Sequence, residues 1–303
     1  MVKKITLMVL GLFLFFTSSI NLQAQETGHY VPGLMGIKAA TLPPPGSYYI
    51  MHNIYYSANK FNNADGNDAD IDFDLDVFVS AQRFVHVWED VFLGANYAVN
   101  VIVPLMNTNI SIGAFNVDDK NFGVGDIIVD PMVLSWSKKK YDIAFGLGAV
   151  APTGSYDITK AASPGKSFWT ALITFGGTYY FDEHKSWSAS LLSRYEIHSK
   201  KKDYDITAGN DFTFEWGIGK TIPKKLVWTL GVSGYAHWQV TEDKGNDIQY
   251  DASVKDRVFA AGPEIDCVIP SIKFIMELRG LAEFGAVDRS QGATFCLSLI
   301  KAF

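Results

Sequence analysis

The chain has little cysteine, no long hydrophobic run beyond its start and no cluster of basic residues. Its 2 cysteines among 303 residues exclude a disulfide scaffold and, without a CxxC or Cys/His cluster, a zinc module. After residue 25 no stretch reaches the ~18 unbroken apolar residues of a membrane helix. Because no basic patch or arm is present, we expect no nucleic-acid partner.

The common catalytic motifs are missing as well. HExxH, GxSxG and the phosphate-loop and dinucleotide-binding glycine patterns do not occur in a usable context, and the six histidines have no metal-ligand spacing. An acidic stretch at 62–76 offers oxygen ligands for calcium but lacks the spacing of a calcium loop, which favours a solvated loop. The sequence therefore predicts no enzyme, no cofactor and no metal site.

What the chain does have is apolar and aromatic material. Hydrophobic residues make up 48% and aromatic residues 14% of the sequence, with 26 glycines against 11 prolines. This composition excludes a disordered chain, which has too few apolar groups to form a core. So many aromatic residues and glycines favour a β-rich fold over a helical enzyme.

The first residues have the pattern of an export signal. A positive start at Lys3 and Lys4 is followed by an apolar run over 5–16, and residues 22–24 fit a small-residue cleavage site. Residues 1–24 are therefore predicted to be a cleaved signal peptide, and the protein is predicted to be exported.

After the signal, apolar and polar residues alternate along most of the chain. Phe212 and Phe214 fall on one face, for example, whereas Asp211, Thr213 and Glu215 fall on the other. Such a period of two predicts strands with one apolar and one polar face. The predicted strands are 46–58, 71–87, 91–112, 123–137, 141–152, 168–181, 186–198, 208–220, 226–239, 257–269, 272–284 and 292–303. Pro104 is expected to break or bend the third of them.

Short and long connections alternate between these strands. The short ones lie at 88–90, 138–140, 182–185, 221–225 and 270–271, and the long ones near 59–70, 113–122, 153–167, 199–207, 240–256 and 285–291. This alternation is typical of transmembrane barrels, which have tight periplasmic turns and longer outer loops. We therefore predict an all-β fold in which residues 46–303 form an antiparallel transmembrane β-barrel of about twelve strands. A secreted β-sandwich or propeller is the alternative.

The barrel prediction places the protein in the outer membrane of a Gram-negative bacterium, as a monomer in contact with lipid and lipopolysaccharide. Aromatic residues gather where the two membrane interfaces would lie. Those near the short turns are Trp88, Trp136, Tyr141, Phe181, Trp187 and Trp228, and those near the long loops are Tyr56, Trp169, Tyr195, Phe212, Trp238 and Phe284. The chain ends in an apolar strand closed by Phe303, which resembles the signal that the barrel-assembly machinery reads in outer-membrane barrels.

If the apolar faces point to lipid, the opposite faces line a lumen. The charged side chains predicted to face that lumen are Asp72, Asp74, Asp76, Arg194, Glu215, Lys273, Glu277 and Arg279, together with Asp126, Asp130, Asp211, Glu264, Asp266 and Glu283. Charges are tolerated there because water or partners surround them. A hydrogen-bonded network that closes the lumen is favoured over a cation-selecting channel.

Residues 25–45 contain four prolines and several glycines and are not predicted to form a strand. Their apolar side chains need burial, which favours a plug inside the barrel over a periplasmic tether. The plug residues expected to line the path of a solute are His29, Tyr30, Pro32, Leu34 and Met35.

Four short motifs resemble an outer-membrane protein family. They are GHYVPGLMG at 28–36, LPPPGSYY at 42–49, FGVGDIIVDPMVLSW at 122–136 and APTGSYD at 151–157. The family is the one described as "Putative MetA-pathway of phenol degradation", distantly similar to channels for long-chain fatty acids and aromatic hydrocarbons. The resemblance implies a barrel with an N-terminal segment inside that transports small, often hydrophobic molecules. The Asn-Pro-Ala element of the fatty-acid channels is absent, and those channels have about fourteen strands.

The function predicted is passive uptake of a small apolar or aromatic solute across the outer membrane. Capture is expected at aromatic residues of the outer rim, namely Phe61, Phe115, Phe122 and Phe168. Two alternatives remain open. One is a closed barrel that serves as an adhesin or assembly surface, and the other is a rim hydrolase of lipid or peptide that uses His198 or His237.

Overall fold

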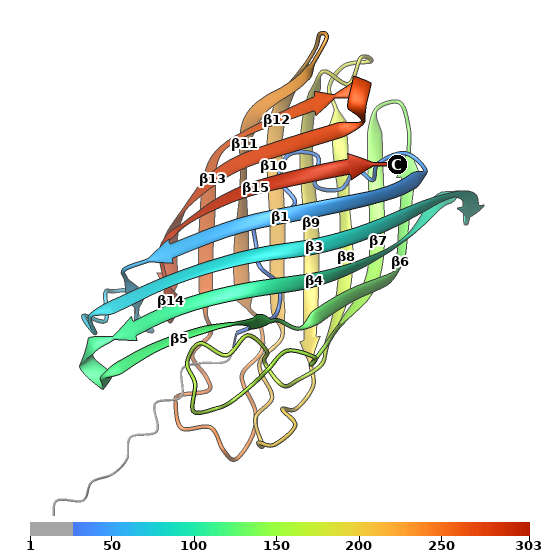
Figure 1. Ribbon diagram of the computed structural model, residues 1–303. Helices are drawn as coiled ribbons and strands as arrows, with labels where there is room; N and C mark the ends of the chain where they lie inside the picture. Colours follow the sequence, from blue (N-terminus) through green and yellow to red (C-terminus); the bar gives the residue numbers. More distant parts are fainter. Residues whose placement is uncertain (1–26) are drawn as a thin grey trace, which may run out of the picture.

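The computed structural model describes residues 27–303, so the predicted signal peptide lies outside the described residues. Antiparallel strands wrap into one tilted barrel (Figure 1). Its twelve wall strands are β1 (Gly46–Ala58), β3 (Phe73–Phe92), β4 (Ala95–Ile112), β6 (Ile127–Ser137), β7 (Tyr141–Ala151), β8 (Thr170–Tyr180), β9 (Trp187–His198), β10 (Asp211–Pro223), β11 (Val227–Gln239), β12 (Arg257–Ile269), β13 (Phe274–Val287) and β15 (Ala293–Ala302). Among residues 27–303, no helix is long and apolar enough to cross a membrane.

The barrel closes through its first and last strands. Along β1, Tyr48 pairs with Ala302 of β15, and on the other edge of β1 the same Tyr48 pairs with Val85 of β3. The order then runs in sequence around the wall from β3 through β4 and β6 to β15. Phe303 therefore lies at the end of the barrel that carries the short turns (Figure 1).

Twelve wall strands match the predicted number, and β1 and β12 have the predicted bounds. The structure adds β5 (Val117–Val124), which was expected to be loop. Two short strands, β2 (Phe61–Asn62) and β14 (Arg289–Ser290), pair with each other at the end of the barrel that carries the long loops.

Pro104 marks a change of partner along β4 rather than a break. Residues before it, up to Ile102, pair with β6, whereas residues from Leu105 onward pair with β5. The prolyl nitrogen has no proton to donate, so this position suits the step between two partners. Its carbonyl oxygen accepts a hydrogen bond from Gly125, one of the two residues between β5 and β6.

The predicted turn at 88–90 is wrong. These residues lie inside β3 at a register shift, that is, a β-bulge. The chain reverses instead at Leu93 and Gly94, which have φ angles of 54° and 76°. Two consecutive residues of positive φ form the tight hairpin turn whose twist matches that of the flanking strands.

The barrel is apolar outside and polar inside. Large apolar side chains that point outward stay exposed, among them Phe84, Phe175 and Leu191 at 50–57%. Charged side chains of the opposite faces are buried, such as Glu215 at 2% and Arg279 at 1%. Lipid is the environment that favours such an apolar exterior, so the wall has the character of a transmembrane barrel.

Six of the twelve aromatic residues expected at the interfaces are exposed, as Trp187 and Phe181 are at the turn end and Trp169 at the loop end, and the other six are half-buried. Tyr56 is one of the half-buried residues. Its hydroxyl donates to Glu283 at 2.8 Å, so this side chain points into the lumen.

Three predicted lumen acids, Asp72, Asp74 and Asp76, do not face the lumen. Along β3 the buried face carries Val79, Ala81 and Val85, while the residues at the positions between them point outward. Asp76 accepts a hydrogen bond from the exposed Tyr55 at 2.7 Å. The prediction failed because β3 has its apolar face inward, and these acids occur near its loop end, where the outer surface can be hydrated. Lys273 is also misplaced, since it is exposed in the turn before β13.

A closed barrel predicts heat-modifiable migration. Unboiled protein in a mild detergent gel is expected to run faster than boiled protein, because strand pairing around the whole ring resists detergent until heat breaks it. Identical migration of the two samples would contradict the closed wall.

Asp182 stabilises the turn between β8 and β9. Its carboxylate accepts hydrogen bonds from the backbone N–H groups of Trp187 at 2.8 Å, His184 at 3.0 Å and Ser186 at 3.1 Å, and from the Ser186 hydroxyl at 2.8 Å. The bond from Trp187, with the others, lowers the pKa of Asp182 from 3.8 to about 2.

This lowered pKa gives a pH-dependent prediction. A carboxylate with a depressed folded-state pKa adds stability above its unfolded value of 3.8 and loses it as pH falls through about 2. Asp182→Ala is expected to lower the urea midpoint of the detergent-folded barrel at neutral pH, with the difference from wild type vanishing at about pH 2. A constant difference across this range would contradict the assignment.

Candidate functional site

The segment before β1 runs along the inner face of the barrel from the loop end to the turn end (Figure 1). At the loop end Lys166 of the β7–β8 loop donates to Gly28, and at the turn end Thr41 donates to Asp142 at 2.9 Å. Between these points the backbone N–H groups of the segment donate to inward-facing side chains of the wall. These bonds are His29 and Tyr30 to Glu196 at 3.1 Å each, Met35 to Glu215 at 2.7 Å, Ile37 to Glu264 at 3.0 Å and Ala39 to Ser190 at 3.2 Å.

Glycines let the segment pass so close to the wall. Gly36 has a φ of 59°, and an added Cβ would lie 2.2 Å from Glu264 and 2.5 Å from Arg279. Gly28 sits between two carboxylates, with an added Cβ 2.1 Å from Asp211 and 2.8 Å from Glu196. A larger residue at either position has no room unless the wall or the segment moves.

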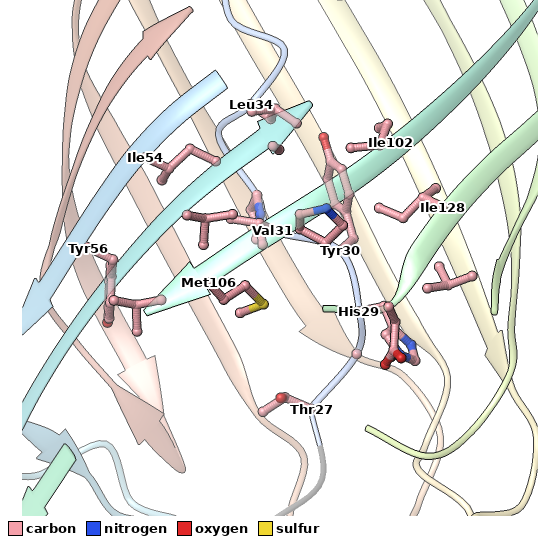
Figure 2. A pocket seen from close by; sticks show the side chains of 18 of the residues that line it. Thr27, His29, Tyr30, Val31, Leu34, Ile54, Tyr56, Ile102, Met106 and Ile128 are labelled. Atoms are coloured by element: carbon pink, nitrogen blue, oxygen red, sulfur yellow. The ribbon is translucent and has the colours of Figure 1, made fainter. Parts of the chain in front are cut away.

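A cavity of about 390 Å³ lies between this segment and the strands opposite. Its apolar wall comes from β1, β3, β4 and β6, and Figure 2 shows Ile54, Ile102, Ile128 and Met106 around Val31 of the segment. Val31 is 42% exposed although it lies inside the barrel. The volume lies within the ~300–1,000 Å³ of typical small-molecule sites.

Polar groups surround the rest of the cavity. Arg83, Asp130 and Arg194 line it, as do His29 and Asp126 toward the loop end. One cavity therefore combines apolar wall residues with charged groups, and Arg83 lies directly beside Ile102.

His29 links the segment to the loop end of the wall. Its Nε2 lies 2.9 Å from Asp126, and its Nδ1 lies 2.7 Å from the Thr170 hydroxyl. Burial lowers the pKa of His29 from 6.5 to about 4, so the ring is neutral at neutral pH. Asp126 also accepts the backbone N–H of Gly154 at 2.7 Å and of Lys166 at 2.8 Å. Because the Asp126 carboxylate accepts all three of these hydrogen bonds, the ring proton of His29 lies on Nε2.

The Thr170 hydroxyl then connects two histidines. Because Nδ1 of neutral His29 has no proton, it accepts the Thr170 hydroxyl proton. Nδ1 of His198 lies 2.7 Å from the same oxygen. The aromatic ring of Phe168 packs between them, 4.6 Å from His29 and 5.2 Å from His198.

His198 and His237 were the residues of the alternative rim hydrolase. Both are buried, at 7% and 3% exposure. Their hydroxyl partners are threonines of strands, Thr170 for His198 and Thr213 for His237, each at 2.7 Å. Their other nitrogens face the carboxylates of Asp211 and Asp256. In residues 27–303 no cluster of three or more His, Cys, Asp or Glu side chains is arranged to hold a metal ion.

Among the other lumen charges predicted, Arg194, Glu215, Glu277 and Arg279 point inward. Arg279 forms ion pairs with Glu264 at 3.0 Å and with Glu277 at 3.1 Å, and it donates to the carbonyl of Gly33 at 3.3 Å. Buried charges of this kind are stable only when paired and hydrogen-bonded.

The predicted path residues all lie in the inner segment. His29, Tyr30, Leu34 and Met35 line the cavity together with Pro32. The hydroxyl of Tyr30 donates to Glu215, and its ring lies 3.9 Å from the guanidinium of Arg194.

The four aromatic residues predicted at the rim differ in exposure and packing. Phe122 on β5 and Phe115 at the tip of the β4–β5 hairpin are exposed, at 70% and 41%. Phe61 packs on Phe73 with 5.6 Å between ring centroids. Phe168 is only 1% exposed, so it is a buried packing residue and not a rim aromatic. The sequence places Phe168 just before a strand, and that position gives no sign that His29 packs against its ring.

The sequence matches the family described as "Putative MetA-pathway of phenol degradation" over residues 58–299. This chain belongs to that family. The resemblance inferred from short motifs is thereby confirmed, and the family match covers most of the barrel wall. No curated protein sequence matches this chain.

The fold of this chain is similar to those of solved outer-membrane barrels. The COG4313 outer membrane channel from Pseudomonas putida F1 matches 91% of this chain and 100% of its own, with a TM-score of 0.76 and 14% identity. The β domain of the Bordetella autotransporter BrkA matches 85% and 99%, with a TM-score of 0.50 and 10% identity. A Pseudomonas aeruginosa FadL homologue, at a TM-score of 0.38 and 10% identity, is too different to carry an argument. The shared fold supports an outer-membrane location.

Gly28→Ala is expected to loosen the inner segment, since the added methyl group collides with Asp211 and Glu196. Overpacking of this kind costs ~1–3 kcal/mol. Trypsin cleavage after the half-buried Lys38, followed by mass spectrometry on folded protein, should become about fivefold to a hundredfold faster. Gly280→Ala is the control, because its added Cβ meets no atom within 4 Å. Equal cleavage of both variants would contradict the tight seat of Gly28.

Proposed function

We propose that this barrel is a channel for passive uptake of small hydrophobic or aromatic molecules across the outer membrane. The observation that carries the proposal is the cavity inside the lumen, whose wall of Ile54, Ile102, Ile128 and Met106 is apolar. A lumen that merely fills with salt bridges has no need for such a wall. Burying an apolar side of a solute there is favourable by ~25 cal/mol per Å².

The path begins at the loop end. Phe115 and Phe122 expose their rings on the hairpin that projects beyond the wall, where an apolar solute first arrives. From there the cavity continues past Thr27 and Val31 to Arg83, ten positions along β3 from its loop end. The expected direction is therefore from the outer loops inward.

The inner segment acts as the plug in this proposal. Its backbone bonds to Glu196, Glu215 and Glu264 hold it across the lumen. Passage requires part of it to rearrange, and residues 27–35, which line the cavity, are the part that a solute contacts first. The loss of a few hydrogen bonds, each worth ~0.5–1.5 kcal/mol, is within reach of a bound solute.

The alternative of a closed structural barrel is favoured by a different observation. The segment makes contacts along its whole course, from Lys166 to Asp142. A barrel that never opens predicts no solute flux even after the plug is removed.

Uptake by lipopolysaccharide-coated cells is the test. Cells with this protein should accumulate labelled phenol-like aromatics and fatty acids faster than cells without it, but not a sugar or an amino acid. Ile102→Gln, which places an amide in the apolar wall, should slow apolar uptake about fivefold or more. Phe84→Leu is the matched control, because Phe84 faces outward and is 55% exposed.

Two further variants separate channel from structural barrel. Deletion of residues 26–45 removes the whole plug, and Glu215→Ala removes only the partner of Met35 and Tyr30. Either change should raise ion conductance in planar bilayers. If neither variant conducts and no solute enters, the closed barrel replaces the channel.

A further inference from the structure

Four arginines place their side chains in the lumen, and they divide into two pairs. Arg279 and Arg289 form ion pairs, with Glu264 and Asp256 respectively, each at 3.0 Å. Arg83 and Arg194 form no ion pair within the described residues 27–303. Nη1 of Arg83 donates instead to the sulfur of Met35 at 3.7 Å.

The second pair also has unused hydrogen-bonding capacity. Nε of Arg83 is buried without an acceptor, as are the Nε atoms of Arg279 and Arg289. Arg194 donates from Nε to the Thr174 hydroxyl at 3.1 Å, and the ring of Tyr30 lies against its guanidinium. An arginine has five N–H donors, so most of those on Arg83 and Arg194 are left for water or a ligand.

Among residues 27–303, the neighbouring carboxylates form no ion pair with either arginine, although Oε2 of Glu196 is itself buried without a hydrogen bond. Asp130 interacts electrostatically with both arginines but lies beyond ion-pair distance, and it accepts the Asn100 side chain at 2.7 Å. Glu196, on the same strand as Arg194, accepts the backbone N–H groups of His29 and Tyr30 through one oxygen. Neither acid neutralises the two guanidinium groups by direct contact.

We infer that Arg83 and Arg194 bind the anionic oxygen group of the solute, so that the cavity takes small apolar carboxylates. Both arginines line the cavity, Arg194 from β9 and Arg83 from β3, where Arg83 pairs across the strands with Ile102 of the apolar wall. A planar guanidinium matches a carboxylate with two parallel hydrogen bonds, and it is less strongly hydrated than an ammonium group. The apolar body then lies against the isoleucines while the charged end meets the arginines.

This inference rests on the proposed function and narrows it to one class of solute. The charge on the solute gives the two arginines a counter-charge in direct contact, whereas the acids around them act only at longer range. A neutral solute of the same shape gains only the apolar contact. The site is therefore expected to distinguish solutes of the same shape that differ only in the charge of one group.

The test compares three benzene derivatives on the full-length protein in liposomes. Benzoate is the anionic probe, benzyl alcohol the neutral one and benzylamine the cationic one, all of nearly equal size. Wild-type protein is expected to bind benzoate in calorimetry and to prefer it over benzylamine by at least tenfold in flux. Arg83→Met and Arg194→Met, which keep the length of the apolar stem, should each weaken benzoate binding about tenfold or more.

Arg257→Met is the control, because this exposed arginine begins β12 outside the cavity lining. Benzyl alcohol flux should change less than about twofold in all three variants. Heat-modifiable migration of each variant checks that it is folded, and the wild-type preference among the three probes needs no variant at all.

The outcomes separate the two proposals. Equal flux of benzoate and benzylamine through wild type, or benzoate binding unchanged by both arginine variants, would overturn the anion site and leave the channel standing. If none of the three probes crosses or binds, the channel itself is wrong, and the anion site with it. Sulfate binding as tight as benzoate binding would show that the apolar wall plays no part, which also overturns the inference.

Discussion

Backbone N–H groups of an irregular segment need acceptors once they are enclosed, and in this protein buried carboxylates of the wall provide them. Glu196, Glu215 and Glu264 are buried, and each accepts from the segment. The wall acids in turn would be unstable without those donors or Arg279. Segment and wall thus satisfy each other, and the position of the cavity follows from where the segment leaves β1, β3, β4 and β6 uncovered.

Much of the wall was predictable because lipid on one side and polar contacts on the other impose a period of two on each strand. β10 is an example, with Asp211, Thr213 and Glu215 buried as its pattern indicates. The same rule failed on β3, where the cavity makes the inner face apolar too. A strand with apolar residues on the lumen side and phenylalanines on the lipid side gives no clear polarity.

The site was only partly predictable. The segment residues His29 to Met35 stood out by their proline and glycine content, but the carboxylates that bind them, Asp126, Glu196 and Glu215, lie 97 to 180 positions away. Arg83 was missed although it continues the alternation from Val79 and Ala81. Whether an inward arginine is paired depends on acids from other strands, and the spacing along one strand does not contain that information.

The course of the inner segment has a consequence for assembly. β1 follows directly after it, and β1 must pair with β15, the last strand of the chain. The ring therefore closes only when β15 meets β1, the strand into which the inner segment leads. The strand that closes the ring is thus the strand that holds the enclosed segment, so a defect at the seam between β1 and β15 would disturb both the wall and the lumen.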